Sequence, residues 1–455
     1  MKILLITTPK EKEIAITVLD DYNSKARSNF PPLGLLYLHS YLKSKHNVSI
    51  VDMNAKEMKI SDITSIVKKH KPDLVGISCV INRWLAVIDL AKLIKKVNRN
   101  IHVVVGGPNP SIYPYETLQC PDIDYVISGF GQVPLMELCD QLEKGQYRNN
   151  IENCYTRDIC NSQTKGSFRY IEIDKFPLPD RTAVPIKLFH APFCPENPFT
   201  TMISSVGCPG QCAFCPCKNY KPIIMRKPEY VADEMESIYK LGIRSVMFQD
   251  ELFTISAQRV QDICKLLLKR KIKLHWTIKS RVNYITKDYL EFGYLDLMKK
   301  AGCFNISLGI ESGTDRILEK MKKYITTKQV IETVRMIKKS GLSCTASFML
   351  GYMDETREEI HRTIDFAVSL GLDNCQFFIT MPEPQTELYD ELQIIRNTTG
   401  NIYSKFTLEH DGMLLKNNIA SERFSREEMI EFMKEAYRRT KNLYIMDKLK
   451  HENKI

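Results

Sequence analysis

Three cysteines stand close together near the middle of the chain and carry its clearest chemical signal. Cys208, Cys212 and Cys215 are separated by three and by two residues, and Gly210 between the first two allows the segment to curl. Three thiolates at this spacing can hold three irons of a 4Fe-4S cube and leave the fourth iron without a protein ligand. The segment therefore predicts an iron–sulfur site that is open to a small molecule.

Other cysteine sites are less well supported by spacing. A structural zinc site requires four ligands with paired spacings, and neither a second pair nor a His-x3-5-His pattern follows the triad. Cys217 lies two residues after Cys215, and the Cys-Pro-Cys step places it poorly to share one cube. Cys154 and Cys160 form a further pair, but two ligands seldom make a site. We interpret Cys217, Cys154 and Cys160 as plain thiols.

The segment 198–385 must position the triad. Short β-branched and aromatic stretches alternate there with amphipathic helical patterns such as Val260, Ile263, Cys264 and Leu267. Six such units are typical of a partial (β/α)6 barrel rather than the full eight-fold barrel, and the triad follows its first strand. The expected strands are Thr200–Ser204, Ser245–Phe248, Leu274–Ile278, Asn305–Gly309, Thr345–Leu350 and Asn374–Thr380.

Residues 1–145 also alternate strand and helix patterns. The strand stretches are apolar on both faces, as parallel strands covered by helices on both sides are. An α/β, doubly wound, Rossmann-like sheet of five strands is therefore expected for this domain. The expected strands are Lys2–Thr7, Val48–Asp52, Leu74–Ser78, His102–Gly106 and Tyr125–Ser128.

Small and glycine residues follow three of these strands. Ligands of doubly wound sheets lie beyond the carboxyl ends of the strands, and glycine lets a ligand approach the backbone closely. A ligand site and a set of tight turns are both consistent with this pattern. The residues concerned are Ser78, Cys79, Val80, Gly106, Gly107, Pro108 and Gly129.

Two further segments complete the chain. Residues 146–197 read as a linker, with a proline cluster around Phe176–Asp180 and a hairpin expected near Phe168–Ile173. Residues 386–455 form a mainly helical C-terminal region. A capping box at Ser425–Glu428 announces its helix, and the apolar stripe that follows is expected to pack on the barrel. That stripe consists of Met429, Phe432, Met433 and Ala436.

Composition excludes several classes of protein. The chain has 455 residues, which at about 150 residues per domain suggests two to three domains. Its 44% hydrophobic and 26% charged residues are ordinary for a globular protein. Its net charge of +10 is mild for this length, so no nucleic-acid partner is expected. No signal peptide or membrane span is expected, and we predict a cytoplasmic protein whose 14 cysteines do not form a disulfide framework.

The cysteine segment resembles a known family. Cys208, Cys212 and Cys215, with Phe214 before the last cysteine, are similar to the radical S-adenosylmethionine (SAM) signature Cys-x3-Cys-x-aromatic-Cys at the start of a βα barrel. The resemblance extends over roughly residues 198–380. It implies a 4Fe-4S cluster whose open iron is chelated by the amino and carboxylate groups of SAM. One-electron reduction then cleaves SAM to methionine and a 5′-deoxyadenosyl radical.

Four later segments resemble the SAM contacts of this family. Each follows a barrel strand, and each offers a carboxylate, a guanidinium or a turn of backbone to one part of SAM. A carboxylate suits the SAM ammonium, and an arginine suits its carboxylate. The residues that the resemblance implies are Asp250, Glu251, Arg281, Glu311, Ser312, Leu350 and Gly351, beside Phe214.

The N-terminal half resembles the cobalamin-binding domain of one class of radical SAM enzymes. The features are Gly34 in the Pro31–Gly34 entry and the Gly106–Pro108 turn. The Asp-x-His-x-x-Gly motif of many corrinoid proteins is absent, so the resemblance implies base-off cobalamin without a His ligand. Gly129–Gln132 also stands where the class commonly has Gly-Glu-Gly-Glu. His39 and His46 are expected to be surface or packing residues.

The resemblance implies a radical SAM enzyme, and a cobalamin-dependent methyltransferase acting on an unactivated carbon is the first hypothesis. Its partners would be a small-molecule or biosynthetic-intermediate substrate and a reductant such as flavodoxin or ferredoxin. A cyclase or rearrangement enzyme with the same cofactors fits these residues equally.

Two other hypotheses fit less well. A tRNA methylthiotransferase-like enzyme would require a second cysteine triad and a basic RNA-binding tail domain. Cys79, Cys120 and Cys139 are available for such a triad. An iron–sulfur electron-transfer or sensor module would prefer a fourth cluster ligand, which the triad does not provide.

Overall fold

The computed structural model describes residues 1–11, 28–80, 83–145, 150–161, 164, 166, 172–395 and 419–440. The chain divides into two compact units, which are described separately. The first contains the N-terminal strand and Asn29–Phe189, and the second contains His190–Thr399 and the C-terminal helix. In the described part of the chain, no helix is long and apolar enough to cross a membrane.

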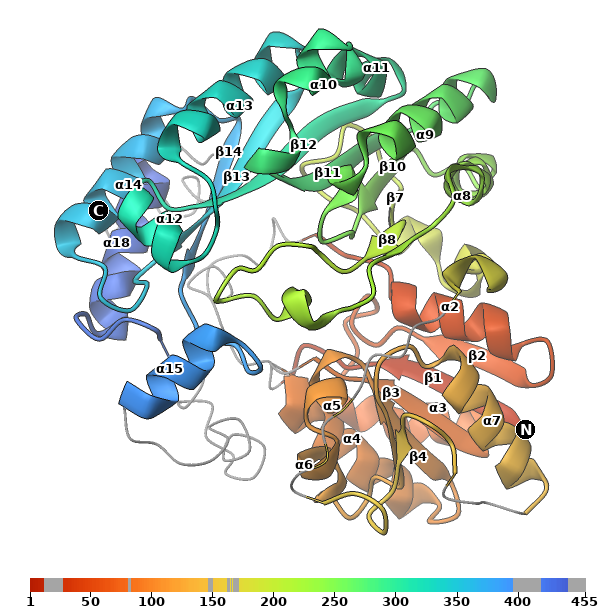
Figure 1. The fold of residues 1–455 in the computed structure, drawn as a ribbon. Helices are drawn as coiled ribbons and strands as arrows, with labels where there is room; N and C mark the ends of the chain where they lie inside the picture. The colour runs from red at the N-terminus through yellow and green to blue at the C-terminus, as the bar shows by residue number, and fades with distance from the viewer. Residues whose placement is uncertain are drawn as a thin grey trace. The chain divides into compact units, whose positions relative to one another are not determined.

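The first unit is a doubly wound α/β sheet, as the sequence predicts (Figure 1). Its strand order is β2-β1-β3-β4-β5-β6, and the first five strands are parallel. The strands are β1 (Lys2–Thr7), β2 (Asn47–Val51), β3 (Leu74–Ser78), β4 (His102–Gly106), β5 (Tyr125–Ile127) and β6 (Cys154–Tyr155). The helices are α2 (Leu33–Leu42), α3 (Ile63–His70), α4 (Trp84–Val97), α5 (Pro108–Ile112), α6 (Pro114–Leu118) and α7 (Gln132–Glu143).

Strand β6 departs from the expected five-stranded sheet. It pairs antiparallel with β5, through Val126 with Tyr155 and Ile127 with Cys154. A strand of two residues has no hydrophobic periodicity to read, so only long-range pairing reveals it. The hairpin expected near Phe168–Ile173 falls mostly outside the described residues, and Ile173 itself begins a short 3-10 helix.

Both faces of this sheet are buried, as the expected strand patterns require. Val103 and Val105 of β4 lie in one apolar core with residues of α3 and α4. Val104, between them, lies in a second core with residues of α2 and α7. Successive side chains of a strand point to opposite faces, so a continuous apolar run fills both cores.

The second unit contains a parallel sheet of six strands in the order β14-β13-β12-β11-β10-β7. This confirms the expected partial barrel. Helices lie along the outer side of the curved sheet in Figure 1. The strands are β7 (Phe199–Met202), β10 (Ser245–Phe248), β11 (His275–Arg281), β12 (Cys303–Glu311), β13 (Ser343–Leu350) and β14 (Asn374–Ile379). The helices are α8 (Pro228–Lys240), α9 (Ala257–Lys269), α10 (Lys287–Glu291), α11 (Tyr294–Lys300), α12 (Asp315–Lys320), α13 (Thr327–Lys339) and α14 (Arg357–Ser369).

The two faces of this sheet differ in chemistry. The outer face is apolar and buried, with side chains such as Trp276, Leu308 and Phe348. The inner face is polar, and several of its side chains are only half-buried. A full eight-fold barrel fills its interior with bulky branched residues, and this half-barrel does not. Polar inner residues are Thr277, Lys279, Asn305, Ser307, Thr345 and Ser347.

The C-terminal region adds α15 (Glu387–Ile395) and α18 (Arg426–Arg439). The expected capping box is present, because Ser425 Oγ accepts from the backbone N–H of Glu428 and Glu428 Oε2 accepts from that of Ser425. The apolar stripe of α18 is buried and Tyr437 Oη bonds the backbone of Phe377 in β14. Helix α18 therefore packs on the half-barrel, as predicted.

Candidate cofactor-binding site

The three cysteines lie in a loop closed by its own two-stranded stem. Strands β8 (Ser205–Val206) and β9 (Ile224–Met225) pair antiparallel, and the loop between them contains the triad. Gly207 begins this cysteine loop with φ +93°, and a Cβ there would lie 2.5 Å from the carbonyl oxygen of Tyr220. The tight start of the cysteine loop therefore requires glycine.

The thiols of the cysteine loop form a suitable donor set for an iron–sulfur cluster. Cys208 and Cys212 are buried, Cys215 is half-buried, and none of them is in a disulfide. A hydrogen bond from Cys217 lowers the pKa of Cys215 to about 7, while the same bond raises the pKa of Cys217. Within the described ranges, no three His, Cys, Asp or Glu side chains already form a gathered metal site.

Arg281, at the end of β11, reaches the cysteine loop. Its Nη1 donates to Cys212 Sγ at 2.9 Å, and its Nη2 donates to the carbonyl oxygen of Lys323 at 2.7 Å. A Cβ on Gly210 would lie 2.6 Å from Arg281 Nη1. Glycine at this position therefore lets the guanidinium approach the sulfurs.

Backbone bonds hold the middle of the cysteine loop on both sides. The N–H of Ala213 donates to the carbonyl oxygen of Met321, and its carbonyl oxygen accepts from the N–H of Leu388 at the start of α15. Phe214 packs against the apolar cluster that contains Met321, Tyr352 and Leu388. The aromatic residue of the motif is therefore an anchor for the cysteine loop.

The end of β10 brings two carboxylates to the stem of the cysteine loop. Asp250 is fully buried and accepts from Ser204 N, Ser204 Oγ and Ser205 Oγ at 2.6–2.7 Å. Glu251 Oε2 accepts from the N–H of Gly207 at 3.0 Å. Burial raises the pKa of both carboxyls. Asp250 ties strand β10 to the stem, and Glu251 lies at the first residue of the cysteine loop.

The end of β12 carries a buried ion pair. Glu311 has φ +74°, and its Oε1 accepts from Lys323 Nζ at 2.8 Å. Both side chains are at most 10% exposed. Lys323 Nζ also lies 5.9 Å from the centre of the Phe214 ring. Ser312, the next residue, bonds Thr363 Oγ1 of α14 at 3.2 Å and so ties the strand end to the outer helix.

The end of β13 forms a turn held by one carboxylate. Leu350 is buried, and Gly351 has φ +79°. The N–H groups of Gly351 and Tyr352 donate to Glu355 Oε2 at 2.6 and 3.1 Å. Burial raises the pKa of Glu355 to about 7, and no described residue bonds its Oε1. Glu355 thus orders the turn that the sequence assigns to SAM.

Sequence reasoning did not find Lys323 or Glu355. Lys323 is one of two adjacent lysines after α12, and consecutive lysines ordinarily indicate a solvated surface. Residues with positive φ flank it on both sides, namely Lys322 and Tyr324. That backbone, which turns Lys323 inward, leaves no signal in residue type. Glu355 carried a weak signal, since it stands four residues after the glycine of the predicted turn.

In the first unit, three strand ends are joined at the carboxyl edge of the sheet. Gly107 has φ +114°, and a Cβ there would lie 2.6 Å from the carbonyl oxygen of Cys79. Ser111 Oγ donates to the carbonyl oxygen of Gly107 at 2.7 Å and accepts from the N–H of Gly129 at 2.8 Å. These contacts bring the ends of β3, β4 and β5 together, as the sequence predicts for parallel strands.

The carboxyl edge presents features that fit a large cofactor. Val80 is 38% exposed, Pro108 is exposed, and Ser78 and Gly106 are half-buried. Asn109 Oδ1 is buried beside them without a hydrogen-bond partner among the described residues. An exposed apolar side chain, an open backbone and an unpaired acceptor suit the face and the amide groups of a corrin. Gly34 lies in the first turn of α2, and a Cβ there would meet open space.

The histidines of α2 and its following loop lie elsewhere, as expected. His39 Nδ1 is 3.7 Å from Asp180 Oδ2, and His46 Nδ1 is 3.4 Å from the N-terminal amine of Met1. Residue 47 pairs with Lys2 at the start of β1, so His46 lies at the amino edge of the sheet. Burial lowers the pKa of both histidines. Their contacts are packing contacts.

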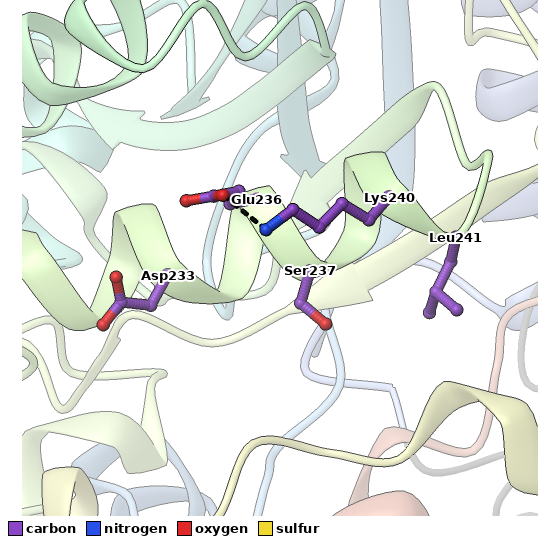
Figure 2. Close-up of a pocket in the computed structure, with 5 residues that line it drawn as sticks. All are labelled: Asp233, Glu236, Ser237, Lys240 and Leu241. Atoms are coloured by element: carbon purple, nitrogen blue, oxygen red, sulfur yellow. Dashed lines mark ion pairs between the residues drawn. The ribbon is translucent and has the colours of Figure 1, made fainter.

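A surface pocket of about 460 Å³ lies on α8 and shares no residue with these strand ends. Figure 2 shows its lining, in which Glu236 and Lys240 form an ion pair at 2.6 Å. Asp233 in the same lining pairs with Arg270. The charges of this pocket are thus compensated by neighbouring residues, and it offers no distinct chemistry.

Comparison with family models matches both units. Residues 202–367 match the radical SAM superfamily, and residues 20–139 match the B12 binding domain. The first match lies within the half-barrel up to α14, and the second lies within the doubly wound domain from α2 to α7.

Curated relatives are similar over most of the chain. An uncharacterised methyltransferase from Pyrococcus horikoshii is 34% identical over 446 residues, which is 96% of this chain and 92% of that protein. The anaerobic magnesium-protoporphyrin IX monomethyl ester cyclase of Rubrivivax gelatinosus is 26% identical over 80% of this chain, which spans 66% of the cyclase.

Two solved structures share the fold at low identity. The radical SAM methyltransferase TsrM from Kitasatospora setae has a TM-score of 0.66 at 17% identity, over 86% of this chain and 76% of its own. The cobalamin-dependent radical SAM enzyme OxsB has a TM-score of 0.68 at 18% identity, over 97% of this chain and 61% of its own. With the full-length relative and both matched domains, the chain belongs to the radical SAM enzymes that carry an N-terminal B12-binding domain.

Proposed function

We propose that this protein is a cobalamin-dependent radical SAM methyltransferase that methylates an unactivated carbon of a small-molecule biosynthetic intermediate. One observation carries the proposal. A cysteine loop in contact with Arg281 and a glycine-lined carboxyl edge occur in one chain, and a methyltransferase matches that chain over nearly its whole length. When bound, the cluster with SAM supplies a 5′-deoxyadenosyl radical and cobalamin supplies the methyl group.

The residues of the half-barrel divide into ligands and positioning residues. Cys208, Cys212 and Cys215 would hold the cluster, and Phe214 anchors their loop. The side chains of Glu251, Arg281 and Glu311 and the turn at Leu350–Gly351 would bind SAM. Asp250 and Ser312 would act through these neighbours, since their oxygens already bond Ser204, Ser205 and Thr363. The buried ion pair with Lys323 orients the Glu311 carboxylate.

The carboxyl edge of the first unit would hold cobalamin. Ser78, Val80, Gly106, Pro108 and Gly129, which are exposed or half-buried at this edge, would border the corrin, with Gly34 in the first turn of α2. Cys79 is fully buried and Gly107 makes room for its backbone, so these two residues would shape the edge from beneath. His39 and His46 lie away from this edge, so cobalamin would bind without a protein His ligand. Flavodoxin or ferredoxin would supply the electron.

The proposal is tested with protein purified without oxygen from cobalamin-fed cells. The measurements are iron, sulfide and corrinoid per chain, then the products formed from SAM with titanium(III) citrate. A methyltransferase should contain four irons and one corrinoid per chain and form both S-adenosylhomocysteine and 5′-deoxyadenosine. The Cys212→Ala variant should lose iron and 5′-deoxyadenosine. A wild-type protein that cleaves SAM but retains no corrinoid would contradict methyl transfer.

The similarity to the cyclase supports a second candidate, a cyclisation or rearrangement with the same cofactors. The product ratio separates the two. A methyltransferase consumes SAM both as methyl donor and as radical source. A cyclase uses it only as radical source, so it should form 5′-deoxyadenosine without S-adenosylhomocysteine.

A further inference from the structure

The inner face of the half-barrel carries a polar row across three strands. Ser307 of β12 pairs in register with Lys279 of β11 on one side and with Thr345 of β13 on the other. All three side chains are half-buried. Adjacent residues in register project to the same face, so the three side chains form a continuous polar strip.

This strip lies on the face that the cysteine loop approaches. Arg281 follows Lys279 by two residues on β11, and alternate residues of a strand share a face at a separation of about 7 Å. Because Arg281 contacts Cys212, Lys279 lies one pleat deeper on the face of the half-barrel that would bear the cluster and SAM. It is therefore placed where a substrate of those cofactors would lie.

Lys279 is a cation without an anionic partner in the described part of the chain. Its Nζ donates to Gln249 Oε1 at 3.4 Å, and no described carboxylate lies within ion-pair distance. Glu311 pairs with Lys323, and Glu251, which accepts from Gly207, attracts Lys279 electrostatically without forming an ion pair with it. An ammonium has three donors, and a half-buried one with a single amide partner retains capacity for an anion.

The floor beneath this strip is rigid and uncharged. Asn305 donates from Nδ2 to Thr277 Oγ1 at 3.0 Å and to Thr345 Oγ1 at 3.2 Å. Its Oδ1 is buried without a partner among the described residues. These bonds hold the Asn305 amide in place and leave its Oδ1 acceptor unused. The floor contributes no carboxylate that would neutralise Lys279. The strip thus combines one cation that has no ion-pair partner among the described residues with neutral donors and acceptors.

We propose that Lys279 binds an anionic group of the substrate, a carboxylate or a phosphate, on the inner face of the half-barrel. Ser307 and Gln249 border the same group. The inference rests on the proposed function, because it names the class of substrate for that site. It makes Lys279 the residue that selects acidic substrates.

The test uses cluster-loaded protein and two anionic probes, benzoate and phenyl phosphate, in isothermal titration without turnover. Lys279→Met should weaken binding of at least one probe about tenfold or more, whereas Lys279→Arg should retain it. Lys265→Met is the matched control, because Lys265 on the exposed face of α9 also bonds only an amide oxygen, that of Gln261. Iron content and circular dichroism confirm that each variant folds.

A second arm distinguishes the two sources of a carboxylate at this site. S-adenosylhomocysteine carries the amino-acid group of SAM, and 5′-methylthioadenosine lacks it. Lys279→Met should bind both within about twofold of wild type. Selective loss of S-adenosylhomocysteine binding would assign Lys279 to the SAM carboxylate and overturn the proposal. Two results with the anionic probes would also overturn it: equal binding by wild type and Lys279→Met, or no saturable binding by wild type. Neither arm needs methyl transfer, so failure of the proposed function gives a different pattern.

Discussion

Arg281 and Cys212 are joined by a hydrogen bond from the guanidinium to the sulfur at 2.9 Å, although 69 residues separate them in sequence. The same guanidinium bonds the backbone of Lys323. One side chain at the end of β11 therefore fixes both the cysteine loop and the segment after α12. Four predictions follow from this site and its neighbours.

Replacing Arg281 by lysine should impair cluster loading. Lysine keeps the charge but lacks the planar fork that bonds Cys212 and the backbone of Lys323 together. Loss of one charge-assisted bond corresponds to about 2 kcal/mol. Iron per chain should fall. Unchanged iron content would show that the contact is dispensable.

Gly210→Ala should disturb the same contact from the other side. Its Cβ would lie 2.6 Å from Arg281 Nη1 and 3.3 Å from Cys208 Sγ, so the guanidinium must move. Iron content is the readout, and Gly34→Ala, where a Cβ meets open space, is the control. Equal iron content in both variants would argue against a tight fit at Gly210.

Lys323→Met should destabilise the half-barrel by about 3 kcal/mol, because it leaves the Glu311 carboxylate buried without its ion-pair partner. The double variant with Glu311→Met should recover much of this loss. The two tryptophans lie one in each unit, so a Trp84→Phe background lets Trp276 fluorescence report urea unfolding of the half-barrel alone. Equal destabilisation in the single and double variants would mean that Glu311 is not the stabilising partner.

Glu355 should make stability depend on pH. Its pKa rises from an ordinary 4.5 to about 7 through burial, so the folded state is favoured below pH 4.5 and loses stability as the pH rises through 7. The full change amounts to about 3 kcal/mol. Glu355→Gln keeps an acceptor for the Gly351 and Tyr352 N–H groups and should flatten the unfolding free energy of the half-barrel across this window. A wild-type slope retained in the variant would assign the dependence to another group.

The sequence by itself determined the main strands and the chemical type of the site, but not the two-residue strands β6, β8 and β9. In the first unit, the ends of the five parallel strands lie within one residue of their predicted positions. All six strands of the half-barrel were also predicted. The triad, the strand ends and the capping box were also readable. These signals are local, because periodicity, spacing and turn residues act over a few neighbouring positions.

Only the tertiary structure decided which side chains meet. Three features depend on strands and loops distant in sequence: the inward turn of Lys323, the bonds of Asp250 to two serines, and the contact of the Lys279 ammonium with the Gln249 amide. Asp250 shows the difference well, because its residue type suggests a ligand contact while its neighbours assign it to the loop stem. Residue type sets what a side chain can do, and burial and long-range contacts set what partners remain for it.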